Sequence, residues 1–446
     1  MLKPIPVDVV IFGAGVAGLW LLARLRKLGY QAVLLEQQAI GAGQTRYAQG
    51  IIHGGTKYAL SGQLTGSAEA IAEMPAIWRA CLAGEGELDL RQVKLLSPHQ
   101  YLWSSDGLGS RMASFLASKL MRARTRSVAT GERPEVLRNP AFKGQVYQLD
   151  EPVLDTASLL KALATPHLDA ILQLPAGTGT AITREDPMMA GPVSSPYPFG
   201  GETVSAGPIS SPSPSGRGVG ERGSDDHNWQ ITLNHSEHPL TLQTKRIVLC
   251  AGKGNAALLQ QLGMAQPAMQ TRPLNMVMLR AAPGKRLPGE LYAHCLGTSA
   301  IPRITITTHQ DAQGNSLWYL GGQLAEQGVG RSDAEQIAAA QAELTRLFPW
   351  LDLSDAQWAC AQIDRAEPKT PQGERPDTSY VHQQQGVITA WPTKLALAPR
   401  LARQVIEQLV QGGVHAAPSS PVPSELSSWP HPRFAQLPWQ EERRWN

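Results

Sequence analysis

Residues 7–36 read VDVVIFGAGVAGLWLLARLRKLGYQAVLLE, and this stretch decides the fold. A short apolar run breaks at the GAGVAG of residues 13–18, continues with helical spacing, and returns to a second apolar run. The pattern predicts a strand, a glycine turn, a helix and a second strand. Gly13 allows the tight turn, Gly15 lets a pyrophosphate approach the backbone, and Gly18 lets the helix lie close to the sheet.

Glu36 ends the second apolar run, where it can accept hydrogen bonds from a ribose hydroxyl pair and so favours an adenosine without a 2′-phosphate. The helix start offers N–H groups and a positive dipole end to phosphates. Two alternatives are an ordinary strand-to-helix turn and a membrane span, since residues 9–23 carry no charge. That run is shorter than the roughly 20 residues of a span. We therefore predict a dinucleotide-binding βαβ unit and no transmembrane segment.

Composition limits the possible classes of protein. A chain of 446 residues is long enough for two domains or one composite domain. The net charge of +3, from 40 basic and 37 acidic residues, predicts no nucleic-acid partner. The four cysteines form no CxxC pair, so neither a metal site nor a disulfide framework is expected. The N-terminus shows no secretory signal, which favours the cytoplasm, with attachment to the inner face of the membrane through the tryptophan-bearing tail as the alternative.

A second motif lies in the glycine-rich segment that follows. Gly43-Gln44-Thr45-Arg46 and Gly50-Ile51-Ile52-His53-Gly54-Gly55 form a GxxRxxxGxxHxG run. With the first motif, it resembles the D-amino-acid-oxidase and glycerol-3-phosphate-dehydrogenase superfamily of FAD enzymes. The resemblance implies FAD as the cofactor, with this loop along its pyrophosphate and ribityl chain. The cofactor-binding residues expected from the loop are Gln44, Thr45 and Arg46.

The same resemblance places His53 near the flavin ring. An imidazole takes up a proton near neutral pH, so His53 is a candidate base or ring contact. The alternative is a histidine whose hydrogen bonds are satisfied within the glycine loop.

Two later segments carry the resemblance further. The strand predicted over 246–250 is followed by Ala251 and Gly252, and the family places such a strand and Ala-Gly pair where the returning chain covers the nucleotide. Residues 386–394, GVITAWPTK, lead into a helix that the family points at the pyrimidine edge of the flavin. Thr393 and Lys394 are therefore expected at the cofactor. For Lys394, a solvated lysine at the helix start is an equal alternative.

The expected fold class is α/β, with a Rossmann-like FAD-binding domain and a discontinuous, mainly antiparallel-sheet α+β substrate domain. The predicted FAD-binding domain comprises residues 1–90, 150–270 and 370–412, and the substrate domain 91–149 and 271–369. Helices are predicted over 68–83, 108–121, 155–163 and 332–347. Residues 184–228 are rich in Pro, Gly and Ser and predict a disordered insertion at a hairpin tip, with a Pro-rich docking site as the alternative. Residues 413–446 form a tail, extended or partly disordered.

Substrate recognition depends on residues 365–375. This segment resembles the family's Arg-Pro-x-Thr-Pro-Asp-Gly, whose arginine grips a substrate carboxylate, but Glu367 stands where that arginine falls. Arg365 and Lys369 could compensate from neighbouring positions, and Arg303 is a further candidate. The alternative for each is a surface or ion-paired residue.

The predicted function is an FAD-dependent oxidoreductase that oxidises a small CH–OH or CH–NH substrate. An anionic 2-hydroxy acid or glycerol phosphate is preferred over an amino acid. The alternatives are an amino-acid oxidase or dehydrogenase, and a flavin-binding protein without turnover, which the missing arginine suggests. An NAD-dependent dehydrogenase would share the first motif but not the Ala251-Gly252 return. The electron acceptor stays open between oxygen, a quinone and a partner protein.

Overall fold

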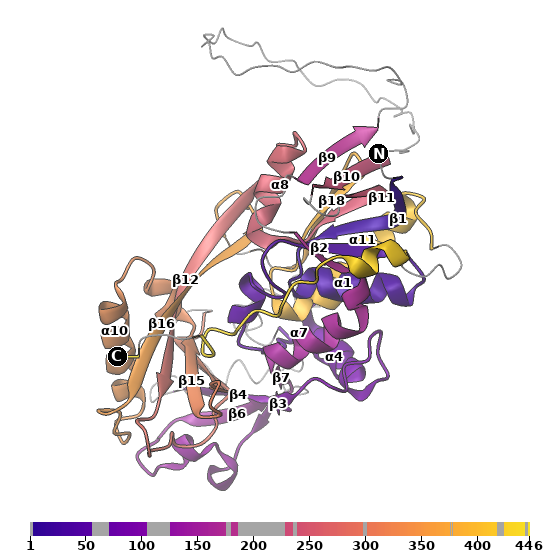
Figure 1. Cartoon of the computed structure of the whole chain (residues 1–446). Helices are drawn as coiled ribbons and strands as arrows, with labels where there is room; N and C mark the ends of the chain where they lie inside the picture. Colours follow the sequence, from indigo (N-terminus) through magenta and orange to yellow (C-terminus); the bar gives the residue numbers. More distant parts are fainter. Residues whose placement is uncertain are drawn as a thin grey trace, which may run out of the picture.

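The computed structural model describes residues 3–55, 71–104, 125–174, 180–185, 228–234, 239–297, 301–374, 376, 378–416, 423–441 and 445–446. Within these residues the chain forms two eight-stranded sheets and a short two-stranded sheet. Each large sheet is the centre of one lobe (Figure 1). The predicted α/β class is confirmed.

The glycine-rich stretch forms the middle of the first sheet. Its strand β1 (Ile5–Phe12) lies between β2 (Ala32–Glu36) and β11 (Leu240–Leu249) and is parallel to both. The path of this sheet is β17-β18-β11-β1-β2-β8, and β10 and β9 extend it beside β11. Its other strands are β8 (Ile171–Gln173), β9 (Thr180–Glu185), β10 (Asn228–Leu233), β17 (Tyr380–Gln384) and β18 (Val387–Trp391).

Helices cover one face of this sheet in a shared apolar core. The glycine turn leads into α1 (Val16–Lys27), which packs against α7 (Thr156–Ala164) and α11 (Ala398–Gln411). Helix α1 is buried on most of its circumference, as expected for a helix packed between a sheet and other helices. The opposite face holds α8 (Asn255–Gln261), and α4 (Met74–Ala83) packs at the edge of the first core.

The second sheet is mainly antiparallel. Its order is β16-β12-β15-β14-β13-β4-β6-β5, and only its pairing of β13 with β4 is parallel within the described residues. Its strands are β4 (Gln100–Ser104), β5 (Thr125–Ser127), β6 (Gln145–Leu149), β12 (Met269–Arg280), β13 (Ala293–Cys295), β14 (Ile304–Gln310), β15 (Ser316–Gly321) and β16 (Gln357–Pro368). The two-stranded sheet pairs β3 (Leu95–Ser97) with β7 (Val153–Leu154).

The second sheet has two different faces because side chains alternate along each strand. On the outer face, Val277 and Trp358 pack against α10 (Asp333–Leu347). The helix predicted over 332–347 is thus confirmed, and Ser332 caps it in a reciprocal capping box with Glu335. A shorter helix, α9 (Gln323–Gln327), follows β15.

The long strands β12 and β16 connect the two lobes. They pair over twelve residues each and run from the second sheet toward the first (Figure 1). The inner face of the second sheet carries Met276, Met278 and Tyr319.

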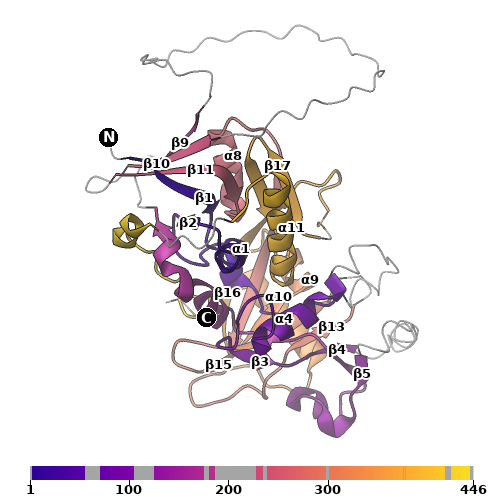
Figure 2. The same ribbon diagram turned by 90° about the vertical axis from the view of Figure 1, so that its right-hand side faces the viewer.

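The described part of the tail begins with a 3₁₀ helix, Ser424–Ser428, and then runs across both lobes (Figures 1 and 2). Trp429 donates its indole N–H to the Gln173 carbonyl at 2.7 Å, and Phe434 forms a bridge with Ile40. Farther on, Asn446 exchanges backbone hydrogen bonds of 2.9 Å with Trp358 of β16. The tail therefore fastens the first sheet to the second.

Several predictions fall on residues that the structure does not describe. The Pro-rich insertion lies outside the described residues from 186 to 227, between the paired strands β9 and β10. The helix predicted over 108–121 also lies outside them, and the one over 68–83 is described only from residue 71. None of the described helices has the length and apolar character that crossing a bilayer requires.

Candidate functional site

A cavity of about 630 Å³ opens where β1, β2 and β11 end. Ligands of open α/β sheets bind in this position, and the volume lies within the roughly 300–1,000 Å³ typical of cofactor pockets. The first sheet contributes the glycine turn, Glu36 and the loop after β11, and β16 contributes the opposite wall. Predicted residues in the lining are Gly13, Gly15, Glu36, Gln44, Thr45, Ala251 and Gly252.

The glycine turn is shaped by close backbone contacts. Gly13 has a φ of 103°, and a Cβ there would lie 2.6 Å from the Ala251 Cα. A Cβ on Gly18 would lie 2.0 Å from the Gly13 carbonyl oxygen. Gly18 thus lets α1 approach the turn, whereas Gly13 lets the turn meet the loop after β11.

The N-terminus of α1 faces the cavity at Gly15, which is the N-cap residue. The first turn of α1 carries no acidic residue, so its positive dipole end is not neutralised by its own side chains. The Val16 N–H donates to Thr45 Oγ1 at 3.0 Å, which holds the second motif over the helix start. These groups fit a diphosphate.

The backbone of the glycine turn holds the Glu36 side chain in place. Its carboxylate accepts hydrogen bonds of 2.7 Å from the Ala14 and Gln38 N–H groups. Burial raises the pKa of Glu36, and these backbone hydrogen bonds oppose that rise. Each carboxylate oxygen has a further lone pair for a ribose hydroxyl. The lining therefore fits the adenosine diphosphate half of FAD.

Two contacts join the first sheet to β16 across the cavity. Gln44 donates its amide N–H to the Ala366 carbonyl at 3.1 Å, and Lys253 forms an ion pair with Asp364 at 2.5 Å. Lys253 follows Gly252, and both it and Asp364 line the cavity. Sequence reasoning missed Lys253 and Asp364, because their pairing depends on how the two sheets meet.

Four predicted cofactor residues are absent from the described lining: Gly18, which packs behind the turn, and Arg46, Thr393 and Lys394. Arg46 pairs with Glu441 of the tail and donates to the Tyr47 hydroxyl at 2.6 Å. Thr393 has a φ of 59° and donates its hydroxyl to the Thr378 carbonyl at 3.0 Å, and Lys394 is buried beside it. The helix expected directly after Lys394 begins later, because a 3₁₀ turn at 395–397 precedes α11.

His53 lies in a buried polar cluster between the lobes. Its Nδ1 is 3.5 Å from Glu151 Oε2, and its ring stacks on His294 with centroids 5.4 Å apart. Glu151 follows β6 and His294 lies in β13, so both come from the second lobe. Sequence reasoning missed both residues, because no spacing relates them to the glycine loop.

The expected substrate cations occupy different places. Arg365 lies 3.6 Å from Glu326, and Arg272 of the neighbouring strand lies 2.7 Å from Glu367. The second contact is an ion pair whose angles fall outside hydrogen-bond geometry. Arg272, Arg365 and Glu367 on the inner face of β12 and β16 form a charge cluster with Glu326 of α9. Arg272 was not predicted.

Arg303 and Lys369 lie away from this cluster. Arg303 is paired with Glu343 of α10 on the outer face of the second sheet, so the structure separates it from the cavity. The Lys369 side chain is exposed just after β16. Of the predicted cations, Arg365 therefore lies in the described charge cluster.

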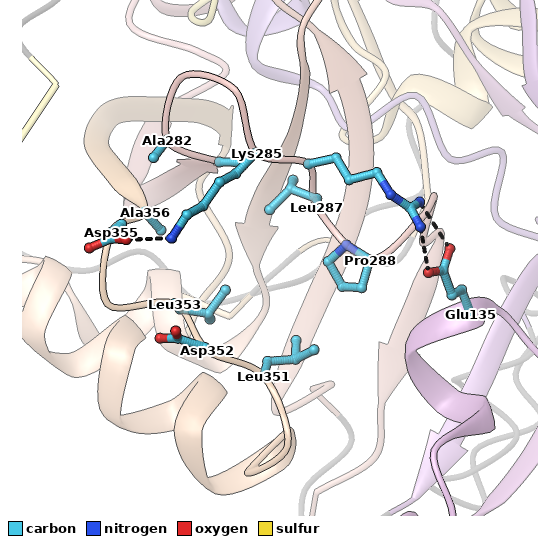
Figure 3. A pocket seen from close by; sticks show the side chains of 12 residues that line it. Glu135, Ala282, Lys285, Leu287, Pro288, Leu351, Asp352, Leu353, Asp355 and Ala356 are labelled. Atoms are coloured by element: carbon cyan, nitrogen blue, oxygen red, sulfur yellow. Dashed lines mark hydrogen bonds and ion pairs between the residues drawn. The ribbon is translucent and has the colours of Figure 1, made fainter.

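A smaller pocket of about 270 Å³ lies at the far end of β12 and β16 (Figure 3). Leucines, Pro288 and alanines line it, and ion pairs of Lys285 with Asp355 and of Arg286 with Glu135 border it. Ala356 at this pocket and Ile363 in the lining of the first cavity are separated by about 23 Å of extended strand. No predicted site residue lies in this pocket. No group of three His, Cys, Asp or Glu side chains within the described residues could hold a metal ion.

Comparison with known proteins identifies the family of the chain. The sequence profile of the FAD dependent oxidoreductase (DAO) family matches residues 8–168. The probable FAD-dependent oxidoreductase PA4991 of Pseudomonas aeruginosa is 43% identical over 441 residues, covering 99% of each chain. Its crystal structure superposes with a TM-score of 0.75 at 39% identity, covering 98% of this chain and 99% of that one.

More distant structures share the fold. Glycine oxidase from Geobacillus kaustophilus has a TM-score of 0.57 at 17% identity, covering 91% of this chain and 95% of its own. L-α-Glycerophosphate oxidase from Mycoplasma pneumoniae, solved with FAD bound, has a TM-score of 0.55 at 13% identity and full coverage of both chains.

Proposed function

The chain belongs to the FAD-dependent oxidoreductases of the D-amino-acid-oxidase superfamily, and from this we propose that it oxidises a small CH–OH or CH–NH substrate at the inner face of its second sheet. When bound, FAD supplies the redox chemistry. The cavity carries the proposal, because it combines the glycine turn, Glu36 and the loop after β11 with a wall from β16.

The residues of the cavity have separate proposed roles. Gly15 and the start of α1 hold the diphosphate, and Glu36 holds the ribose. Gln44 and the pair of Lys253 with Asp364 keep the two lobes together over the cofactor. Lys394 remains a proposed contact to the pyrimidine edge, supported by its buried position after β18.

We further propose an anionic substrate, a 2-hydroxy acid or glycerol phosphate rather than an amino acid. Arg365 supports this, since its ion pair with Glu326 is long at 3.6 Å and a substrate anion could compete for the guanidinium. His53 is the proposed proton acceptor. The relatives' names include both amino-acid and glycerophosphate oxidases, so they are compatible with either class.

One observation favours a second candidate. Glu367 occupies the position where the family resemblance expects an arginine, and it already holds Arg272. A flavin-binding protein without turnover would tolerate such a pair.

Anaerobic flavin reduction tests these candidates. The purified holoenzyme is mixed without oxygen with a panel of 2-hydroxy acids, glycerol phosphates, and D- and L-amino acids, and the visible flavin absorption is followed. We expect bleaching by an anionic hydroxy compound. Bleaching by amino acids alone would establish the amino-acid oxidase alternative. If dithionite bleaches the flavin and no metabolite does, the second candidate stands. Rates of reoxidation by oxygen and by a soluble quinone then identify the acceptor.

A further inference from the structure

Glu151 is a buried carboxylate directed at the loop that holds the proposed proton acceptor. Its Oε1 accepts the Gly54 N–H at 2.7 Å, and its Oε2 accepts an N–H from the Gln100 amide and lies 3.5 Å from His53 Nδ1. The Glu151 side chain is only 4% exposed, whereas that of His53 is 20% exposed. The imidazole can therefore meet a ligand while the carboxylate stays behind it.

The backbone around this pair is fixed from both sides. The Ile52 N–H donates to the Pro152 carbonyl and the Leu154 N–H donates to the Gly50 carbonyl, each at 2.9 Å. The glycine loop thus pairs with the chain that leaves the second sheet. Movement of that chain would carry Glu151 and the loop together, so the distance between Glu151 and His53 is set by main-chain hydrogen bonds.

His294 fixes the plane of the His53 ring. The two imidazoles are nearly parallel, at 16° and 5.4 Å between centroids, and His294 Nδ1 lies 2.8 Å from Thr305 Oγ1. His294 is itself buried in β13. A ring stacked in this way keeps Nδ1 toward Glu151, and Nε2 then lies on the opposite side of the imidazole.

We propose that Glu151 is a positioning residue that holds His53 as the Nδ1–H tautomer, so that Nε2 accepts the substrate proton. This inference rests on the proposed function. A carboxylate beside one ring nitrogen keeps the proton there, leaves a lone pair on the other nitrogen, and stabilises the imidazolium that forms. The substrate O–H or N–H bond breaks and its proton moves to Nε2. A C=O or C=N bond would then form at the adjacent carbon, and FAD, when bound, would serve as the two-electron oxidant that accepts the hydride.

The surroundings of His53 support this arrangement. Among the described residues, Glu151 and His294 are titratable groups in contact with the His53 side chain. The next carboxylate along the chain, Asp150, is exposed and bound by Arg79 of α4 at 2.8 Å. Glu151 is thus the carboxylate placed to govern the ionisation of His53.

The test compares Glu151→Gln with Glu135→Gln in the FAD-loaded enzyme. Glu135 is a glutamate of the second lobe whose ion pair with Arg286 lies at the distant pocket in Figure 3. The titration of His53 is followed by ¹⁵N-histidine NMR, its signal being assigned by its loss in His53→Gln. Loss of the neighbouring negative charge should move the His53 titration about one to three pH units lower in Glu151→Gln. Glu135→Gln should leave it unchanged.

Flavin reduction gives the second readout once a substrate is known. In Glu151→Gln the plateau rate of anaerobic reduction should fall about 10- to 100-fold, as for other lost orienting partners. The limb of the pH–rate profile, where the rate of flavin reduction rises as His53 loses its proton, should move to lower pH. The flavin content should stay intact. A purely structural role would not move the limb. Glu151→Asp keeps the charge and should restore the wild-type limb.

Distinct results would overturn the proposal. An unchanged His53 titration in Glu151→Gln excludes Glu151 as its partner. If that variant does not fold, the wild-type NMR tautomer decides, and an Nε2–H tautomer contradicts the proposal. A shifted titration in a protein whose flavin no metabolite reduces would retain the pair of Glu151 with His53 and reject the proposed oxidation instead.

Discussion

Arg272 and Glu367 form an ion pair of 2.7 Å at the position on β16 where the family resemblance expects an arginine. The guanidinium comes from β12, where Gln270 is the strand partner of Glu367. The Glu367 side chain is 3% exposed and that of Arg272 is 23% exposed. A buried carboxylate needs a counter-charge. Glu367 of β16 stands where the resemblance expects an arginine, and Arg272 of the neighbouring strand β12 supplies the positive charge that its carboxylate needs.

Removing Arg272 should therefore destabilise the fold. Arg272→Ala leaves the Glu367 carboxylate buried without this partner, and we expect a loss of about 3 kcal/mol in the free energy of unfolding. Urea titration of the holoenzyme measures it. The control is Arg286→Ala, whose pair with Glu135 is on the surface and should cost less than about 1 kcal/mol. Equal losses in the two variants would show that the buried pair has no special role.

Arg365 and Arg303 give a matched pair for the substrate question. Both are arginines of the second sheet paired with a glutamate, but Arg365 lies in the inner charge cluster and Arg303 pairs with α10 outside. Arg365→Ala should raise the KM of an anionic substrate about 10-fold or more, since a charge-assisted contact contributes about 1.5–3 kcal/mol. Arg303→Ala should leave KM unchanged. Steady-state assays would contradict the proposed anion contact if the two variants behaved alike.

The part of the cavity lining around the glycine turn could be predicted because its residues are close in sequence. The turn at 13–18 and Glu36 belong to one βαβ unit and Thr45 lies in the loop after it, and the glycines at 13 and 18 allow close backbone contacts. Even the Ala251-Gly252 return follows a recognisable strand. For these residues, local spacing and the family resemblance were sufficient.

The rest depends on how distant segments meet. Arg46 pairs with Glu441, which is 395 residues away in the sequence. The Arg303 side chain lies on the outer face of its sheet, where it pairs with Glu343, and not on the inner face. Strand alternation can assign two faces to a sheet, but nothing in the strand itself says which face looks toward the cavity. Glu151 was missed for the same reason, because it reaches the loop of His53 only through tertiary packing.

Gly15 offers a direct test of cofactor binding. A Cβ at Gly15 would lie 3.2 Å from Thr45 Oγ1, and the branched side chain of Gly15→Val would extend farther into the space expected for the diphosphate. We expect this variant to be purified without visible flavin absorption. Gly131→Val is the control, since a Cβ there meets no atom within 4 Å. If the purified Gly15→Val protein were yellow, the diphosphate would have to bind elsewhere than at this turn.

The last prediction concerns acid stability and His309. This imidazole is buried on the inner face of the second sheet, where Nε2 lies 2.9 Å from Thr307 Oγ1 and the ring stacks on Trp439 of the tail with centroids 4.1 Å apart. Burial lowers the pKa of His309 to about 3. Its ordinary pKa is about 6.5, so between these values the unfolded chain binds a proton that the folded chain does not. Folding stability must then fall as the pH falls through this window.

Lowering the pH from 7 to 5 should cost about 2 kcal/mol through His309, at about 1.4 kcal/mol per pH unit below 6.5. Urea titrations at both pH values measure the loss, and His309→Gln should reduce it by that amount, because glutamine has no proton to gain. His415→Gln, at an exposed position beyond α11, should leave the loss as in the wild type. Only the difference between the two pH values is compared, so a uniform destabilisation by either substitution cancels. An equal pH dependence in His309→Gln and the wild type would mean that His309 takes up its proton in the folded protein as readily as in the unfolded chain.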